Sequence, residues 1–176
     1  VTNDIALGVR TPTRHAEEIK KNYGVALQKL IEQEEFIDVP GVGEREALSL
    51  SNFVLASVIE PRYAELFELV LDELQRSGYE ERIGAGIVLT GGTSKIKGAI
   101  ELAEEIFHMP VRLGMPRDIG GLRGEVENPI HSTGVGLLLY GIAQQAYGER
   151  RGVHPAPVSS SESLWERIKG WFNGNL

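Results

Sequence analysis

Residues 86–98 constrain the fold of this chain more than any other stretch. They read Gly-Ile-Val-Leu-Thr-Gly-Gly-Thr-Ser-Lys-Ile-Lys-Gly. The unbroken apolar run Ile87–Leu89 is typical of a strand covered on both faces, as in a parallel sheet between helices. The glycine pair at 91–92 permits a sharp turn, and Thr93 or Ser94 can cap a helix that starts there. This succession of an apolar strand, a glycine turn and a helix predicts an α/β protein.

The glycine turn is also a candidate ligand contact. Without Cβ atoms a ligand can lie against the backbone, and free N–H groups at a helix start favour anionic groups. The pattern is weak by itself, because Gly-Gly between a strand and a helix is more often only a turn. The Gly-x4-Gly-Lys-Ser/Thr spacing of a P-loop is absent. Two interpretations of the glycine pair therefore remain: a turn without a ligand, and a nucleotide site.

The composition of the 176-residue chain excludes several function classes. It contains no cysteine, so neither a disulfide framework nor thiolate chemistry is available, which fits a reducing compartment. The four histidines show no metal-ligand spacing, and a net charge of −7 argues against nucleic acid as the main partner. No apolar run approaches the ~20 residues that span a membrane. The length fits one domain or a compact pair.

Three charged residues share one face of a helix predicted over about residues 14–30, which begins after Thr-Pro-Thr. Glu17, Lys20 and Lys21 have the spacing i, i+3, i+4, which makes them neighbours. One interpretation is a surface salt bridge worth about 0.3 kcal/mol. The other is a polar clamp on a ligand. From the spacing alone, the salt bridge is favoured.

A hairpin and a long helix follow and predict a small α+β subdomain. Residues 34–39 and 45–50 read as two strands around a Pro-Gly turn. The helix keeps its periodicity over about residues 52–77, with a kink or restart at Pro61, and ends at Gly78.

The second half continues the α/β pattern. We expect a short strand over residues 111–114, a surface loop over 115–128 and a second helix from Ser132. That helix carries three glycines in its first ten residues. Each costs roughly 1 kcal/mol relative to alanine, which favours close packing on another backbone or on a ligand.

The C-terminal segment is amphipathic. Residues 148–163 read as a flexible linker. In the helix predicted over 164–176, apolar side chains fall within an arc of about 120°; they are Leu164, Trp165, Ile168, Trp171 and Phe172. A helix docked on the body is one interpretation. The long linker and the two tryptophans favour the other, a helix lying in the plane of a membrane surface. A single weakly basic copy binds weakly, so stable attachment requires self-association.

Together these stretches resemble the FtsA family of actin-like bacterial cell-division proteins. The resemblance rests on residues 1–6, 13–24, 59–63 and 86–98, the helix from Ser132 and the tail, and it covers essentially the whole chain. It implies an α/β fold: the second nucleotide-binding lobe of the actin/heat-shock-chaperone/sugar-kinase fold, with a small inserted α+β subdomain and a C-terminal amphipathic helix. We expect the chain to be the C-terminal part of a protein about twice as long.

The resemblance also implies domain boundaries. We expect the nucleotide-binding lobe at residues 1–30 and 84–147, the subdomain at 31–83, the linker at 148–163 and a membrane-targeting helix at 164–176. The family's first lobe, both phosphate loops and catalytic acidic residue would all precede this chain. We therefore expect no catalytic residue here and at most a slow ATPase.

The implied cofactor is ATP with Mg²⁺, held weakly or not at all by this part alone. In the resemblance, the glycine turn approaches the adenosine and α-phosphate through its backbone, and Ile96 packs on the adenine. The charged trio of the first helix contacts the ribose and adenine, which now favours the clamp over the plain salt bridge. The implied contacts are Glu17, Lys20, Lys21, Gly91, Gly92, Thr93 and Ile96.

The resemblance finally implies partners and a location. The subdomain would receive the C-terminal peptide of FtsZ, the tubulin-like ring protein, near Arg62 and Arg76. The expected function is an ATP-binding adaptor that polymerises on the anionic cytoplasmic face of the inner membrane and anchors the FtsZ ring at the division site. The alternatives are a sugar or acetate kinase of the same fold, and another actin-like filament or pilus-assembly ATPase. The amphipathic tail favours the adaptor.

Overall fold

The computed structural model describes residues 1–41, 47–117, 119–120 and 123–150. The chain divides into two compact units, Val1–Thr133 and Gly134–Leu176. The predicted amphipathic helix lies outside the described residues, as does all of the predicted linker except its first three residues.

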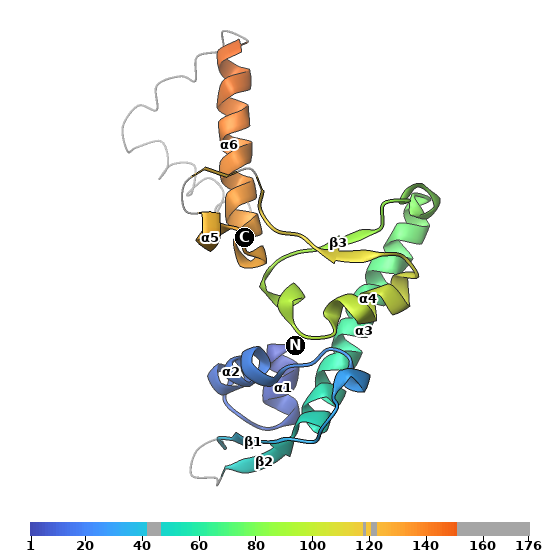
Figure 1. The fold of residues 1–176 in the computed structure, drawn as a ribbon, viewed down its shortest axis with the longest axis vertical. Coiled ribbons are helices and arrows are strands. Elements are labelled where there is room, and N and C mark those ends of the chain that lie inside the picture. Colours follow the sequence, from blue (N-terminus) through green and yellow to red (C-terminus); the bar gives the residue numbers. More distant parts are fainter. Residues whose placement is uncertain (42–46, 118, 121–122, 151–176) are drawn as a thin grey trace, which may run out of the picture. The chain divides into compact units, whose positions relative to one another are not determined.

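The first unit is built along one long helix, α3, which spans Asn52–Ser77 (Figure 1). Its start is fixed by Ser51, whose side chain accepts a hydrogen bond from the Phe53 N–H at 3.3 Å. Its end is fixed by Gly78, which adopts the left-handed conformation at φ +70°. The predicted bounds of this helix are confirmed.

Of the kink or restart predicted at Pro61, the restart is wrong, because α3 continues through this residue. A proline inside a helix removes one backbone hydrogen bond. Buried side chains on both sides of it, Ile59 at 0% exposed and Tyr63 at 4%, hold the two halves of α3 against the same core. Their packing outweighs the lost bond.

Two short helices pack at the N-terminal end of α3. α1 spans Thr2–Gly8 and α2 spans Thr13–Tyr23, and they contact each other, while α1 also contacts α3. The predicted helix over about residues 14–30 corresponds to α2, and its predicted end at residue 30 is wrong. It ends at Gly24, where a Cβ atom would lie 2.3 Å from the Lys20 carbonyl oxygen.

The segment after α2 is extended because it pairs with the chain that follows the glycine turn. Val25 forms a parallel bridge with Lys97, and the Ala26 N–H donates to the Lys97 carbonyl at 2.7 Å. A short 3₁₀ turn, Gln28–Leu30, then leads toward the hairpin.

The predicted hairpin is confirmed. β1 (Phe36–Val39) pairs antiparallel with β2 (Leu48–Ser51), with Ile37 opposite Leu50. Both of these side chains are 5% exposed, so one face of the hairpin joins the core.

The glycine stretch forms a parallel βαβ unit. β3 (Ile87–Leu89) pairs with β4 (Val111–Leu113), and α4 (Ala99–Phe107) connects them. The prediction of a strand buried on both faces is wrong, because Val88 is 48% exposed while its neighbours pack against the core.

The helix of this unit starts later than predicted. The glycine turn continues into a 3₁₀ turn, Gly92–Lys95, and Ile96 is extended before α4 begins. The reason is the pairing with Val25, which a helix starting at Thr93 or Ser94 would prevent.

The core of the first unit runs along α3. An aromatic series links α3 to α4: the rings of Tyr63 and Phe67 lie 5.9 Å apart, and those of Phe67 and Phe107 lie 5.7 Å apart. Aliphatic side chains from α1, α2, the hairpin and α3 itself fill the other end. The largest fully buried ones are Ile5, Val39, Leu55 and Ile59.

Two further helices complete the described chain. The predicted loop over 115–128 contains the short α5 (Arg123–Val126), and the helix predicted from Ser132 is confirmed as α6 (Ser132–Arg150). The close packing expected at its glycines is not observed, since a Cβ atom at 134, 136 or 141 would meet no described atom within 4 Å. Among the described helices, none is long and apolar enough to cross a membrane.

Candidate functional site

A cleft of about 990 Å³ lies between α2 and the turn that follows β3. Ligand pockets commonly have volumes of about 300–1,000 Å³. The cleft is lined by six of the seven residues expected to contact a nucleotide: Glu17, Lys20, Lys21, Gly92, Thr93 and Ile96. Gly91 is not among the lining residues. Whether a nucleotide binds to these residues stays a prediction.

The charged trio of α2 forms a compact ion-pair network at the cleft. Lys20 Nζ lies 2.5 Å from Glu17 Oε2, and Lys21 Nζ lies 3.5 Å from Glu17 Oε1. The salt bridge and the ligand clamp are therefore not exclusive. The bridge fixes the carboxylate in place, while Oε1 keeps capacity to accept from a ligand hydroxyl.

Thr2 on α1 completes this network, although no sequence pattern indicates a role for it. Its hydroxyl donates to Glu17 Oε2 at 2.6 Å and accepts from Lys20 Nζ at 2.8 Å. Thr2 precedes Glu17 by 15 residues, so only the packing of α1 on α2 brings them together. α1 thus supports one wall of the cleft.

The network keeps Glu17 ionised. The hydrogen bond from Lys20, and then that from Thr2, lower the pKa of Glu17 from 4.5 to about 2. At neutral pH this carboxylate is an acceptor only, which suits ligand hydroxyl or amino groups and not a phosphate.

This shift predicts a pH dependence of stability. Because the folded-state pKa is lower than the unfolded one, Glu17 stabilises the fold above about pH 4.5 and loses this contribution as the pH falls toward about 2. The side chain is 35% exposed, so screening limits the contribution to at most about 1 kcal/mol. Thermal unfolding between pH 6 and pH 3 should show a smaller loss of stability for Glu17→Gln than for the parent. Equal losses would contradict the assignment.

The opposite wall of the cleft is the glycine turn. The Ser94 hydroxyl donates to the Gly91 carbonyl at 2.6 Å, and the Ile96 N–H donates to the Thr93 carbonyl at 3.2 Å. Ser94 is only 8% exposed, and the sequence interpretation missed this internal role. Ile96 supplies an apolar surface close to Gly24, where a Cβ atom would lie 2.7 Å from Ile96 Cδ1.

The two arginines expected to receive a peptide are already paired. Arg62 Nε and Nη2 each lie 2.8 Å from the Asp4 carboxylate, and Nη1 lies 2.5 Å from Glu65. The hydrogen bond from Arg62 holds the pKa of Asp4 well below its usual range. Arg76 pairs with Glu73 one turn earlier. The membrane-binding residues predicted in the tail lie outside the described residues.

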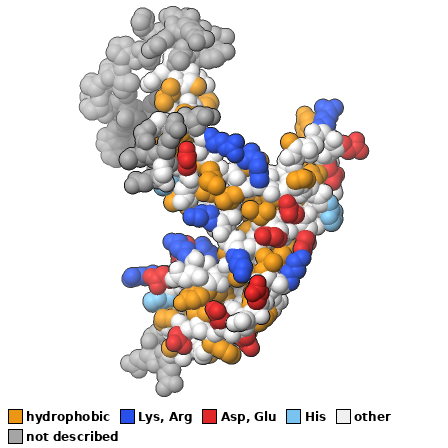
Figure 2. All heavy atoms as spheres, in the orientation of Figure 1, with side chains coloured by type: hydrophobic (Ala, Val, Ile, Leu, Met, Phe, Trp, Pro, Cys, Tyr) orange, Lys and Arg blue, Asp and Glu red, His pale blue; other side chains and the backbone are white. Residues whose placement is uncertain are grey.

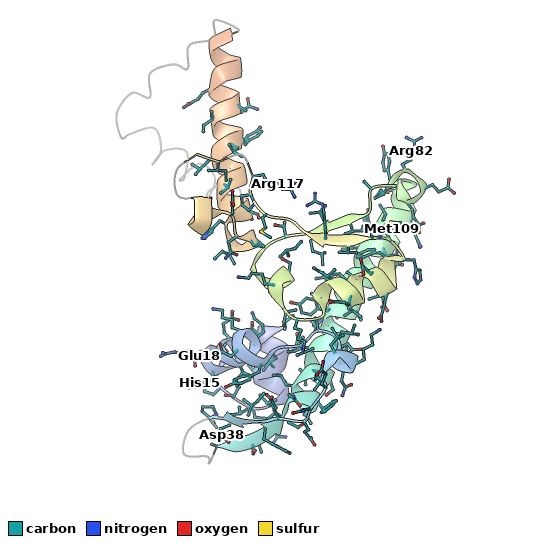
Figure 3. All side chains as sticks on the ribbon, viewed as in Figure 1. His15, Glu18, Asp38, Arg82, Met109 and Arg117 are labelled. Atoms are coloured by element: carbon teal, nitrogen blue, oxygen red, sulfur yellow. The ribbon has the colours of Figure 1, made fainter. Side chains whose placement is uncertain are left out.

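Charge is otherwise mixed over the surface. Figure 2 shows acidic and basic side chains interspersed over the face in view. Figure 3 labels His15 and Glu18 on α2, where His15 Nδ1 lies 3.4 Å from Glu18 Oε2. In the part of the chain that the structure describes, no three His, Asp or Glu side chains are grouped to hold a metal ion.

Comparison with known proteins decides the family. The family model for the cell division protein FtsA matches residues 1–136. The chain belongs to the FtsA family. The resemblance stated from the sequence is thereby confirmed, and it singles out the cell-division family from the alternatives left open.

FtsA relatives match along nearly the whole chain. The FtsA of Pseudomonas aeruginosa is 58% identical over 100% of this chain, that of Neisseria meningitidis 48% over 100%, and that of Escherichia coli K12 41% over 98%. These matches cover 43%, 43% and 42% of the respective relatives. The chain thus spans less than half the length of the FtsA proteins that it matches.

Solved structures confirm the actin-like α/β fold. MreB 5 of Spiroplasma citri, in a structure described as bound to AMPPNP, is similar with a TM-score of 0.65 over 85% of this chain and 44% of that chain. A second structure of the same protein, bound to ADP, gives a TM-score of 0.62. At 17% sequence identity, these similarities concern the fold alone.

Proposed function

We propose that this chain forms the C-terminal, ATP-binding part of an FtsA that polymerises on the membrane and anchors the FtsZ ring there. The observation that carries the proposal is the cleft, in which an ionised carboxylate and two ammonium groups on α2 face a glycine turn. A cell-division role follows from the family; the ligand, the partner and the membrane are the proposed part.

The cleft offers each chemical group that adenosine requires. Glu17 Oε1 would accept from a ribose hydroxyl, while Lys20 and Lys21 would donate to ring or ribose acceptors. Ile96 is a partly buried apolar surface on which an adenine ring can pack. The backbone of Gly92 and Thr93 lies at the cleft wall, where the absence of a side chain at Gly92 leaves room for a phosphate.

ATP is favoured over other ligands with these groups because both similar MreB 5 structures are described with an adenine nucleotide or its analogue. We assign no Mg²⁺ contact to the described residues, since no three acidic or histidine side chains among them are grouped to hold a metal ion. The metal would be held by the phosphates and by residues outside the described part.

The FtsZ peptide would dock on one face of α3. Arg62, Leu66, Leu69 and Arg76 fall within about 80° of one another around the helix, and the arginines lie roughly 21 Å apart along it. The two leucines are 52% and 61% exposed. A short peptide with apolar side chains and acidic ends fits such a face. Because both arginines already pair with carboxylates, the leucines would supply most of the binding energy.

The expected domain division is part of the same proposal. Residues 1–30 and 84–147 would be the nucleotide lobe, and 31–83 the subdomain that carries the FtsZ face. The linker at 148–163 would let the helix at 164–176 reach the inner membrane at the division site. Filaments would multiply weak tail contacts into firm attachment.

Co-sedimentation with anionic vesicles, FtsZ and ATP tests this proposal in a full-length FtsA that carries this sequence as its C-terminal part. The parent should bring FtsZ to the vesicles. Trp171→Glu should abolish vesicle binding of both proteins, because a charge on the apolar face opposes insertion. Leu69→Glu should leave FtsA on the vesicles and lose FtsZ.

Each of these two variants has a matched control, in which glutamate is introduced outside the proposed binding face. Asn173→Glu lies on the polar side of the predicted tail helix, and Leu7→Glu replaces another exposed leucine, 71% accessible on α1. Both controls should behave as the parent. Vesicle binding by Trp171→Glu would contradict the membrane anchor, and FtsZ recruitment by Leu69→Glu would contradict the α3 docking face.

A further inference from the structure

A single hydroxyl connects the long helix to the glycine turn. Tyr63 projects from the middle of α3, and its hydroxyl donates to the Thr93 carbonyl oxygen at 2.8 Å. Tyr63 is 4% exposed and lines the cleft together with Thr93.

We propose that Tyr63 is a positioning residue that fixes the glycine turn in the conformation that contacts the ligand. The nature of the ligand rests on the proposed function, but the link between hydroxyl and turn does not. The other hydrogen bonds of the turn lie on its own side of the cleft: they join residues 91–96 to one another, and the Ile96 carbonyl accepts from the Ala99 N–H at 3.2 Å. The pairing of Lys97 with Val25 begins only after the turn.

The geometry makes this hydrogen bond well suited to that role. The Thr93 carbonyl accepts from both the Tyr63 hydroxyl and the Ile96 N–H, so the direction of the Thr93 peptide is set by two donors. The Tyr63 ring packs edge-on to Phe67 at 5.9 Å, which prevents the hydroxyl from following a moving turn. A phenol is protonated at physiological pH and can donate, and burial raises the pKa of Tyr63 further, to about 12.

The neighbouring residue gives α3 a second attachment beside the cleft. Arg62 binds Asp4 on α1, and α1 also carries Thr2, which holds Glu17. Two consecutive residues of α3 therefore attach it to both sides of the cleft. Arg62 binds α1, which supports the α2 wall, and Tyr63 binds the glycine turn, which is the other wall. α3 thus sets the spacing of the two walls together with the Val25–Lys97 bridge, which favours a positioning role for Tyr63 over a purely packing role.

Tyr63→Phe tests the inference because it keeps the ring and removes only the hydroxyl. Tyr79→Phe is the matched control, since Tyr79 is 58% exposed and contacts Arg82 outside the cleft. The first measurement is amide hydrogen exchange of residues 91–96 in a nucleotide-free full-length FtsA carrying this sequence. The second is the ATP dissociation constant of the same variants.

We expect Tyr63→Phe to raise exchange at Ser94 and Ile96 about fivefold and to weaken ATP binding about threefold to tenfold, with Tyr79→Phe unchanged. Exchange at Leu55, about two helical turns before Tyr63 in α3, serves as the internal reference for an intact fold. Unchanged exchange in the turn would overturn the inference, as would faster exchange with unaltered affinity. If the parent itself fails to bind ATP, the proposed function fails, and the exchange at the turn still decides whether Tyr63 positions it.

Discussion

Replacing Lys20 by alanine should weaken ATP binding about tenfold to a hundredfold in a full-length FtsA that carries this sequence. Hydrogen bonds to charged groups contribute about 1.5–3 kcal/mol, and about 1.4 kcal/mol corresponds to tenfold in affinity. Lys20 is 12% exposed and bonds both Glu17 and Thr2. Its loss would remove a donor from the cleft and release the Glu17 carboxylate, which we propose accepts from the ribose.

Lys29→Ala is the control for this substitution. Lys29 is 61% exposed, pairs with Glu105 and does not line the cleft. Calorimetric titration with ATP should give the parent affinity for Lys29→Ala and the weakened affinity for Lys20→Ala. Equal ATP affinities for the parent, Lys20→Ala and Lys29→Ala would contradict the proposal that α2 contacts ATP.

Replacing Gly98 by alanine should destabilise the first unit by about 3 kcal/mol. Gly98 has φ +84°, which disfavours any residue with a Cβ atom, and it forms the N-cap of α4. An added Cβ would also lie 2.8 Å from Leu27 Cβ and 2.9 Å from the Leu27 backbone nitrogen. Backbone strain and overpacking each cost about 1–3 kcal/mol, and the Leu27 backbone cannot move without disturbing the Val25–Lys97 bridge.

Gly84→Ala separates this effect from a general intolerance of glycine substitution. Gly84 has no positive φ, and its added Cβ would meet no described atom within 4 Å. Thermal unfolding should show a lower melting temperature for Gly98→Ala and little change for Gly84→Ala. A parent-like melting temperature for Gly98→Ala would show that the chain around α4 adapts more freely than the structure indicates.

Elements set by local signals could be predicted from the sequence. The bounds of α3 follow from Ser51 and Gly78, and the hairpin follows from the Pro-Gly turn between its strands. The actin-like fold and the family followed from motifs spread along the chain. Six of the seven expected contacts line one cleft, although the sequence indicated only a glycine turn and a charged helix face.

The misplaced helix ends lie where segments distant in the sequence meet. The end of α2 and the start of α4 were both misplaced, and a single cause explains both, the bridge between Val25 and Lys97. No local pattern encodes such a pairing. The roles of Thr2, which supports the cleft wall, and of Tyr63, which lines the cleft, were missed for the same reason, because each reaches its partner through helix packing.

Amide hydrogen exchange with and without ATP tests the central claim most directly, in a full-length FtsA that carries this sequence as its C-terminal part. The account predicts that ATP slows exchange in two separate segments, residues 17–24 of α2 and residues 91–96 of the glycine turn, while the hairpin at 36–39 and 48–51 is unaffected. ATP binding that protects neither segment would place the nucleotide elsewhere and contradict the account.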